Sequence, residues 1–416
     1  MRFKDFTKAG HLPTLFSAFL YFDISFMVWM LLGPLAVFIS EDFHLSPAQK
    51  GLLVAYPILS GALLRLFLGP LADRIGAKKT ALLGLLLTLL ILLWGFLGAN
   101  SLSELHLLGC LLGIAGASFA VALPMASRWY PPQYQGLAMG IAGAGNSGTV
   151  LTALFAPLLA RYFGDWHIVF ALAMIPVAIT WGVVAFLAKE SPNRAAPKKA
   201  KEYLALLKEP DTLWFCLFYS VTFGGFVGLA SFLPTFFVDQ YHLDKVKAGQ
   251  FTALSVFTGS FLRPFGGYLA DRFGGIRMLT FLYLAICGFL FFIAQLPTLS
   301  LLLPLLLVVM ALLGSGNGSV FQLVPQRFRR QIGVITGIVG AAGGIGGFFV
   351  PSTFGFLKQT IGTYGTGFAL FAVVSLICAG LILLLNPVWQ RAGWLGAGGK
   401  AIADKQAPIQ PILEEA

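Results

Sequence analysis

Long apolar runs, each ended by a short polar or basic segment, recur along the whole of this sequence. A helix needs about 20 such residues to cross the hydrocarbon core of a bilayer. Only 11% of the residues are charged, whereas soluble domains carry about 25%. The sequence therefore predicts an all-α, polytopic membrane protein with twelve transmembrane helices, at 12–38, 49–71, 79–98, 105–126, 135–160, 167–188, 212–237, 248–270, 277–296, 299–325, 332–357 and 363–387.

Lysines and arginines are distributed unequally between the two sides of these spans. Of the 28, 21 fall in one set of loops, five in the other and two inside spans. Loops rich in Lys and Arg stay in the cytoplasm, so we expect both termini there and the chain in the cytoplasmic membrane, surrounded by lipid. The net charge of +11 then reflects topology, and we expect no nucleic acid partner. The four cysteines are isolated in spans, so we expect neither a metal nor a cofactor.

The two halves of the chain repeat one another. Residues 51–79 and 249–277 align without a gap, and 12 of the 29 positions are identical. Weaker echoes pair 111–124 with 312–325 and 140–145 with 337–342. An even number of spans in each half makes the repeat parallel, with an axis along the membrane normal. We expect an N-terminal six-helix bundle at 1–188, a cytoplasmic linker at 189–211, a C-terminal six-helix bundle at 212–390 and a cytoplasmic tail at 391–416.

One arginine lies inside an apolar span at the same place in each half, Arg65 and Arg263. A charged group there costs about 2.5–3.5 kcal/mol on insertion scales, and guanidinium keeps its proton. From Arg65 to Asp73, at the end of the span, is roughly 12 Å of helix. The hydrocarbon half-thickness is about 15 Å, which puts both arginines near the midplane. The pair is typical of a clamp for an anion.

Asp23 is the acidic residue that falls inside a predicted span, at a depth similar to that of Arg65. An intramembrane carboxylate pairs with a cation or relays a proton. A structural hydrogen-bond acceptor at a helix contact is an equal alternative.

The repeated segments GPLADRIGAKK, from Gly69, and GYLADRFGGIR, from Gly267, resemble the loop motif of the major facilitator superfamily. The resemblance covers essentially the whole chain and implies two six-helix bundles around a central cavity in a monomer. In that superfamily the motif stabilises one access state through cytoplasmic contacts. The resemblance implies that the gate residues are Asp73, Arg74, Asp271 and Arg272. Anchoring of helix ends by these charges is compatible with that role.

Two glycine-rich spans also correspond between the halves. The first contains a G-x-G-x-x-G pattern, but no strand precedes it, which excludes a dinucleotide fold. Small residues at helical spacing let membrane helices pack closely. Together with Pro157, Pro351 and the two span arginines, the segments resemble the twin signatures of the nitrate/nitrite porter family. The glycines concerned are Gly140, Gly143, Gly145, Gly148, Gly337, Gly340, Gly343 and Gly344.

The nitrate/nitrite porter resemblance implies transport of nitrate, and of nitrite, by alternating access. It further implies that Phe119 and Phe321 sandwich the anion, while Tyr219 and Phe223 line the site. Asn146 is a candidate donor of an amide hydrogen bond. A planar guanidinium matches a planar oxyanion through two parallel hydrogen bonds.

Several functions stay open at this point. Nitrate/nitrite antiport and proton-coupled nitrate symport, the latter through Asp23, both fit. An exchanger of organic phosphates or carboxylates also uses paired arginines, although it needs more polar groups. A transporter-like nitrate sensor is a third possibility. An enzyme is disfavoured, because the spans contain no nucleophile–base pair or metal set.

Overall fold

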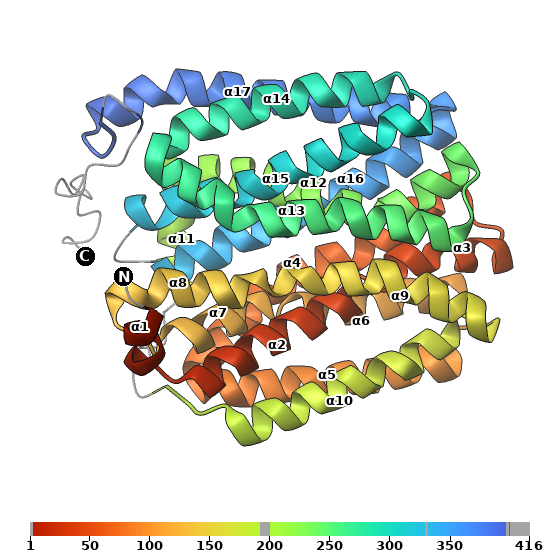
Figure 1. Cartoon of the computed structure of the whole chain (residues 1–416), viewed down its shortest axis with the longest axis horizontal. Helices are drawn as coiled ribbons and strands as arrows, with labels where there is room; N and C mark the ends of the chain where they lie inside the picture. The colour runs from red at the N-terminus through yellow and green to blue at the C-terminus, as the bar shows by residue number, and fades with distance from the viewer. Residues whose placement is uncertain (1–2, 192–199, 329–331, 397–398, 400–416) are drawn as a thin grey trace.

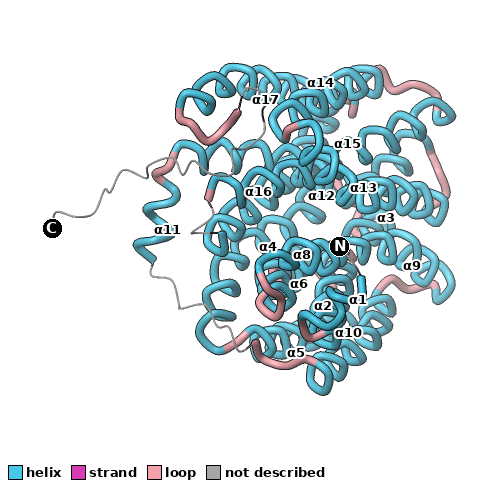
Figure 2. The backbone as a smooth tube through the Cα atoms, turned by 60° about the vertical axis from the view of Figure 1, so that its left-hand side comes forward, coloured by secondary structure: helices cyan, strands magenta, loops and turns pink. Residues whose placement is uncertain are grey.

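The chain folds into two helical bundles that lie side by side in the computed structural model (Figure 1), which describes residues 3–191, 200–328, 332–396 and 399. The first half contains α1 (Phe3–Ala9), α2 (Leu12–Trp29), α3 (Leu32–Asp42), α4 (Pro47–Ile75), α5 (Ala77–Gly98), α6 (Leu102–Gly116), α7 (Phe119–Ser127), α8 (Pro132–Gly143), the 3₁₀ helix η1 (Ala144–Ser147), α9 (Gly148–Phe163) and α10 (His167–Leu187). The second half contains α12 (Pro210–Tyr241), α13 (Lys245–Phe273), α14 (Gly275–Ala294), α15 (Leu299–Arg327), α16 (Ile332–Ile361) and α17 (Gly365–Arg391). Short loops join most of these helices, as Figure 2 shows.

The prediction of twelve spans is confirmed. Within the described ranges, eleven helical segments are long and apolar enough to cross a membrane. The twelfth is α13, which is 29 residues long but less apolar because it carries Arg263 and several hydroxyl side chains. Large apolar side chains such as Phe67, Phe186 and Phe261 point outward and are 70%, 86% and 70% exposed. An apolar outer surface of this extent fits contact with lipid.

Three spans of the first half are interrupted, whereas their counterparts are not. The first span turns at Met30, shortly before Gly33 and Pro34, and divides into α2 and α3. The fourth divides into α6 and α7 at Ala117 and Ser118, and the fifth passes through η1 between α8 and α9. The corresponding α12, α15 and α16 run unbroken for 32, 29 and 30 residues.

The sequence repeat is visible in the backbone at the ends of α4 and α13. Gly76 and Gly274 follow these helices with φ of 104° and 97°. Side chains other than hydrogen rarely tolerate such angles. Both halves therefore require glycine at the same turn, which explains one of the identities.

The two most extensive contacts between the bundles are those of α4 with α16 and of α9 with α13, and α3 also packs against α12. We call the end of the molecule that holds the start of α2 the terminal end, and the opposite end the distal end. Near the distal end, a Cβ at Gly51 would lie 2.4 Å from the Pro351 carbonyl oxygen. A Cβ at Gly249 would lie 2.7 Å from the Pro157 ring. The two prolines of the glycine-rich spans thus occupy equivalent places in the seam.

Three ion pairs cross the seam at the distal end, each with one partner from each bundle. The distance from Lys50 Nζ to Asp239 Oδ1 is 2.9 Å, and Tyr364 donates a hydrogen bond of 2.9 Å to Oδ2 of the same aspartate. The other two pairs are Arg161 with Asp244 and Lys245 with Glu41. Charge and close backbone contact therefore join the bundles at this end.

In the sequence between the two halves, α11 (Ala200–Leu207) lies in the segment expected to be a linker, and it packs against α16 and α12. The start of the expected tail returns to the second bundle, since the Trp394 ring lies 5.4 Å from that of Trp389. Residues 192–199 of the linker and 400–416 of the tail lie outside the described residues.

Candidate anion site

Arg65 is the more firmly held of the two span arginines. Its side chain is only 1% exposed. Nε donates a 3.1 Å hydrogen bond to the Gly116 carbonyl, and Nη1 donates a 2.7 Å hydrogen bond to the Gly340 carbonyl. Gly340 belongs to α16 of the other bundle, so the guanidinium joins the two halves. Nη2 has no hydrogen-bond partner among the described residues and stays available to a ligand.

The Gly116 carbonyl is available because the fourth span is interrupted there. In an unbroken helix it would accept from the Ala120 amide. The Ala120 amide instead bonds to Ala117, at 3.0 Å. The end of α6 thus presents an unused carbonyl, and Arg65 takes it.

Arg263 is held more loosely. It is half-buried, and its Nη2 donates a long hydrogen bond of 3.4 Å to the Tyr219 hydroxyl. The buried Nη1 has no partner within the described part of the chain. Each arginine therefore keeps one buried guanidinium nitrogen without a partner among the described residues, and a buried donor of this kind is costly unless a ligand pairs with it.

Aromatic rings enclose the two guanidiniums. The Arg65 Cζ lies 5.2 Å from the Phe119 ring centroid and 5.4 Å from that of Phe223, while Arg263 lies 6.0 Å from Phe321. Phe119 and Phe321 face each other edge to face across the bundles, with centroids 6.1 Å apart. Tyr219 stacks on Phe223 at 5.0 Å and meets Phe321 edge to face at 4.7 Å. The structure thus brings the four expected aromatic residues together with both arginines.

The two remaining polar candidates lie beside η1. Asp23 accepts a 2.6 Å hydrogen bond from the Ser147 hydroxyl. Among the described residues neither Arg65 nor Arg263 forms an ion pair, so Asp23 does not balance their charge. Asn146 is 1% exposed, and neither of its amide atoms has a partner there. Because η1 lies against α2 and α13, Asn146 sits between the helices of Asp23 and Arg263.

The glycine-rich segments approach this cluster with their backbones. A Cβ at Gly148 would lie 1.8 Å from the Asp23 carbonyl oxygen, and one at Gly343 would lie 2.4 Å from the Tyr219 ring. Three more, Gly145, Gly340 and Gly344, are restricted to different degrees. Gly143 has room for a Cβ, and Gly140 and Gly337 have nothing within 4 Å of the added atom.

The four expected gate residues lie at the terminal end, far along α4 and α13 from the arginines. Asp73 pairs with Arg128, which directly follows α7, and Asp271 accepts a 2.8 Å hydrogen bond from Gln322 of α15. Arg74 and Arg272 are exposed beside them. Each acid therefore ties the end of its helix to a neighbour within its own bundle.

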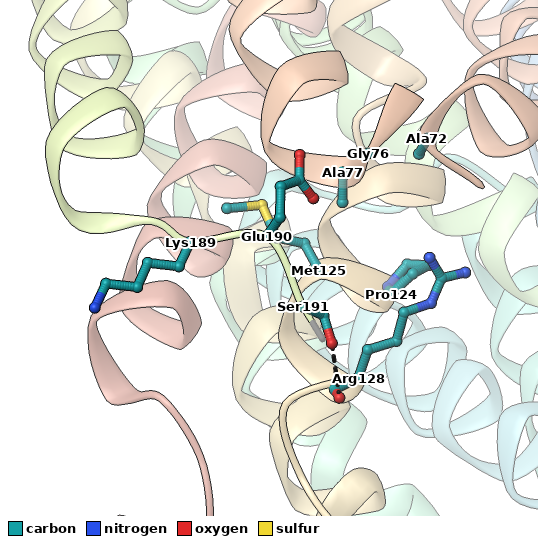
Figure 3. A pocket seen from close by; sticks show the side chains of 9 residues that line it. All are labelled: Ala72, Gly76, Ala77, Pro124, Met125, Arg128, Lys189, Glu190 and Ser191. Carbon is teal, nitrogen blue, oxygen red and sulfur yellow. Dashed lines mark hydrogen bonds between the residues drawn. The ribbon is translucent and has the colours of Figure 1, made fainter. Parts of the chain in front are cut away.

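Figure 3 shows part of the terminal end. Residues 189–191, which follow α10, lie there next to Gly76. Ser191 donates a 3.0 Å hydrogen bond to the Arg128 carbonyl. The Lys79 amide donates one of 3.2 Å to Glu190, whose carboxylate lies at the start of α5, where a helix favours negative charge. The cavity among these residues measures about 10 Å³. That is room for about one water molecule, so the cavity is not a substrate site.

Comparison with known proteins identifies the family. The sequence profile of the Major Facilitator Superfamily matches residues 18–351. The chain is 35% identical over 367 residues to the nitrite extrusion protein of Bacillus subtilis (strain 168), covering 88% of this chain and 92% of that protein. It is 32% identical over 403 residues to the probable nitrate/nitrite antiporter NarK1 of Thermus thermophilus, covering 89% and 90%. The chain belongs to the major facilitator superfamily, in the family of these nitrate and nitrite transporters.

The solved structures agree on the fold of the superfamily. A bacterial homologue of the human lysosomal transporter Spinster, in an inward-facing and occupied conformation, superposes with a TM-score of 0.67 at 19% identity. The match covers 91% of this chain and 97% of that one.

Sequence reasoning missed the groups that hold Arg65. The carbonyl groups of Gly116 and Gly340 accept its hydrogen bonds, and Trp29 lies 5.3 Å from its Cζ. Backbone acceptors leave no signature in side-chain types. The sequence shows glycines at and around positions 116 and 340, but glycines indicate close helix packing and do not indicate where a carbonyl group points.

Proposed function

We propose that this chain is a secondary transporter that carries nitrate, and nitrite, across the cytoplasmic membrane by alternating access. The observation that carries the proposal is the pair of guanidiniums at the seam, each with one buried, unpaired nitrogen and neither with a carboxylate partner among the described residues. Excess positive charge without a counter-ion favours an anion. The names of the relatives, a nitrite extrusion protein and a nitrate/nitrite antiporter, support the same substrates.

The chemistry of the site fits a small planar oxyanion. Arg65 Nη2 and Arg263 Nη1 supply charged donors from opposite bundles, and Asn146 and Tyr219 add neutral ones. The faces and edges of Phe119 and Phe321 leave a narrow apolar slot between the donors. An organic phosphate or a dicarboxylate needs more polar partners than these rings provide, which makes such an exchanger the weaker alternative.

The orientation follows from the distribution of charge. The terminal end carries most of the lysines and arginines, so it faces the cytoplasm under the positive-inside rule. Both halves of the site come from a single chain, which supports a monomer as the transporting unit. The residues Asp73, Arg74, Asp271 and Arg272 would then act on the cytoplasmic side, where each acid fixes the end of the helix that bears a substrate arginine.

Exchange is the mode that the electrostatics favour. One monovalent anion leaves the two arginines with a net positive charge, and the empty site holds two guanidinium charges, one buried and one half-buried, with no counter-ion among the described residues. Moving that empty site between access states carries the cost of unpaired buried charge. We therefore propose nitrate/nitrite antiport, in which one anion leaves only as another enters.

Proton-coupled symport is the second candidate, because Asp23 provides a buried carboxylate next to the site. Its hydroxyl partner Ser147 directly follows Asn146 in η1. A proton on Asp23 would change its hydrogen bond to Ser147, and because Asn146 belongs to the same short helix η1, the position of the Asn146 amide next to the anion would change as well. The hydrogen bond to Ser147 equally fits a purely structural role.

Uptake into proteoliposomes distinguishes these functions. Vesicles are loaded with nitrite or with inert buffer and an internal pH dye, and labelled nitrate is added outside. Antiport predicts uptake only into nitrite-loaded vesicles, without a change of internal pH. Uptake into buffer-loaded vesicles with acidification, lost in Asp23→Asn, would establish symport instead. Nitrate binding without flux would favour a sensor, and displacement of nitrate by phosphate esters would favour an organic anion exchanger.

A further inference from the structure

Asn317 is a buried amide inside an apolar helix that nothing so far explains. It lies in α15 between Gly316 and Gly318, and its side chain is 0% exposed. Neither Oδ1 nor Nδ2 has a hydrogen-bond partner among the described residues. Each buried polar atom left unpaired costs about 1–3 kcal/mol. Such an amide persists in a membrane span when a ligand or a mobile side chain uses it.

The helical register places Asn317 beside the anion site. Phe321, which packs against Tyr219 and lies under Arg263, follows one turn later on the same face of α15. The next residue, Gly318, is so close to α13 that an added Cβ would lie 2.1 Å from the Arg263 carbonyl oxygen. Asn317 therefore lies at the same height along the bundle as Arg263, on the face of α15 that also carries Phe321.

The internal repeat points to the same partner. The segment LLGIAG at 111–116 corresponds to LLGSGN at 312–317, so Asn317 takes the place of Gly116. In the first half, the Gly116 carbonyl accepts the hydrogen bond of Arg65 Nε because the helix is interrupted there. In the second half α15 is unbroken, so its backbone carbonyl is used within the helix. The Asn317 side chain offers at this position a carbonyl group that the helix backbone does not.

We propose that Asn317 is a further substrate-binding residue, which couples Arg263 to the anion. Its Oδ1 accepts a hydrogen bond from one N–H of Arg263 Nη1, whose second N–H stays directed to the anion, and its Nδ2 donates one to an oxygen atom of nitrate or nitrite. Both unpaired amide atoms, and the unpaired nitrogen of Arg263, are then satisfied together. The inference rests on the proposed function and adds a neutral, directional donor from the second bundle, matching Asn146 in the first.

The test combines nitrate affinity with the stability of the substrate-free protein. Asn317→Leu keeps the size of the side chain but removes both polar atoms, and Asn317→Ala does so without risk of a clash. We expect the dissociation constant for nitrate, measured by calorimetry on purified full-length protein, to rise about tenfold or more. The melting temperature without nitrate should stay the same or rise, because an unpaired buried amide has been removed. Asn317→Asp should abolish binding, since its carboxylate would neutralise Arg263.

The matched control is Ser375→Ala in α17. Ser375 is also 0% exposed, but its hydroxyl donates to the Phe371 carbonyl of its own helix. We expect wild-type nitrate affinity in this variant. Unchanged affinity in both Asn317→Leu and Asn317→Ala, with a lower melting temperature, would overturn the inference and leave the proposed function intact. Wild-type protein that binds no nitrate would overturn the proposed function, and this inference with it.

Discussion

The two arginines occupy the same position in the sequence repeat, yet their surroundings differ. Arg65 is almost fully buried and is held by two backbone carbonyl groups, one from each bundle. Arg263 is half-buried and has one long hydrogen bond to a hydroxyl group. The difference follows from the spans next to them, since the α6–α7 span is interrupted and α15 is not. The sequence repeat therefore places an arginine at the same position in each half, but the hydrogen bonds that hold the two guanidiniums differ.

We infer a division of roles from this contrast. A guanidinium that is fixed at two nitrogens presents its third in one direction. A guanidinium with one weak partner can follow the anion as the bundles move. The difference between the halves can be tested in order of the expected size of the effect.

Replacement of either arginine by lysine should have the largest effect. The charge remains, but the planar pair of donors is lost, so we expect nitrate uptake to fall about a hundredfold in Arg65→Lys and in Arg263→Lys. Arg65→Lys should also lower the melting temperature more, because two buried carbonyl groups lose their partner. Near-normal uptake in either variant, at normal expression, would contradict the anion clamp. Equal melting temperatures would contradict the difference between the halves.

A methyl group in the glycine-rich α16 should come next. In Gly343→Ala the new Cβ would lie 2.4 Å from the buried Tyr219 ring, whereas nothing lies within 4 Å of it in Gly337→Ala. We expect nitrate uptake to fall about tenfold in the first variant, since shifted rings misalign Arg263, and to stay normal in the second. The measurement is uptake per mole of purified protein in proteoliposomes. Equal uptake in both variants would show that the rings adjust freely.

Loss of the Tyr219 hydroxyl should have a moderate effect. In Tyr219→Phe, Arg263 loses its side-chain partner, so we expect KM for nitrate to rise about three- to tenfold. The control is Tyr283→Phe, whose hydroxyl donates a 2.6 Å hydrogen bond to the Phe218 carbonyl. That change should reduce stability and leave KM unaltered. An unchanged KM in Tyr219→Phe would mean that the loose hold on Arg263 has no part in binding.

The smallest effects on transport are expected at the distal ion pairs, to which each bundle contributes one charged side chain. Lys50 and Asp239 are 16% and 19% exposed, whereas Arg161 and Asp244 are 61% and 42% exposed. Exposed ion pairs contribute little. We expect Lys50→Gln to change the transport rate a few-fold and Arg161→Gln to leave it unchanged. Equal rates for the two variants would show that burial of the pair is irrelevant to joining the bundles.

Much of the architecture could be predicted because it depends on properties that single residues carry. Apolar runs of sufficient length identified the twelve spans, whereas the depth of the arginines, inferred from the spacing of Arg65 and Asp73, stays a prediction. The repeat predicted that Arg65 and Arg263 would match. The aromatic set of Phe119, Tyr219, Phe223 and Phe321 came from family resemblance alone, since a chain with 39 phenylalanines offers no other way to choose among them.

The asymmetry of the site could not be predicted, because it depends on contacts between distant segments. The hydrogen bond from Arg65 to Gly340 joins residues 275 positions apart. The break after Gly116 lies at Ala117 and Ser118, where no proline marks it. Asn317 did carry a signal, as an amide between two glycines in an apolar span. That signal becomes specific only when Arg263 is known to lack a carbonyl partner.

The glycine–proline contacts in the seam bear on the populations of access states. At Gly51 and Gly249 the bundles touch through backbone and proline ring, without room for a methyl group. Alternating access requires the distal end to open in one state, and an alanine at either position then raises the free energy of the closed arrangement without affecting the open one. Every 1.4 kcal/mol of that difference changes the ratio of the two states about tenfold. The added methyl group at position 51 or 249 does not contact the anion, yet it would change the fraction of time for which the anion site is open to each side of the membrane.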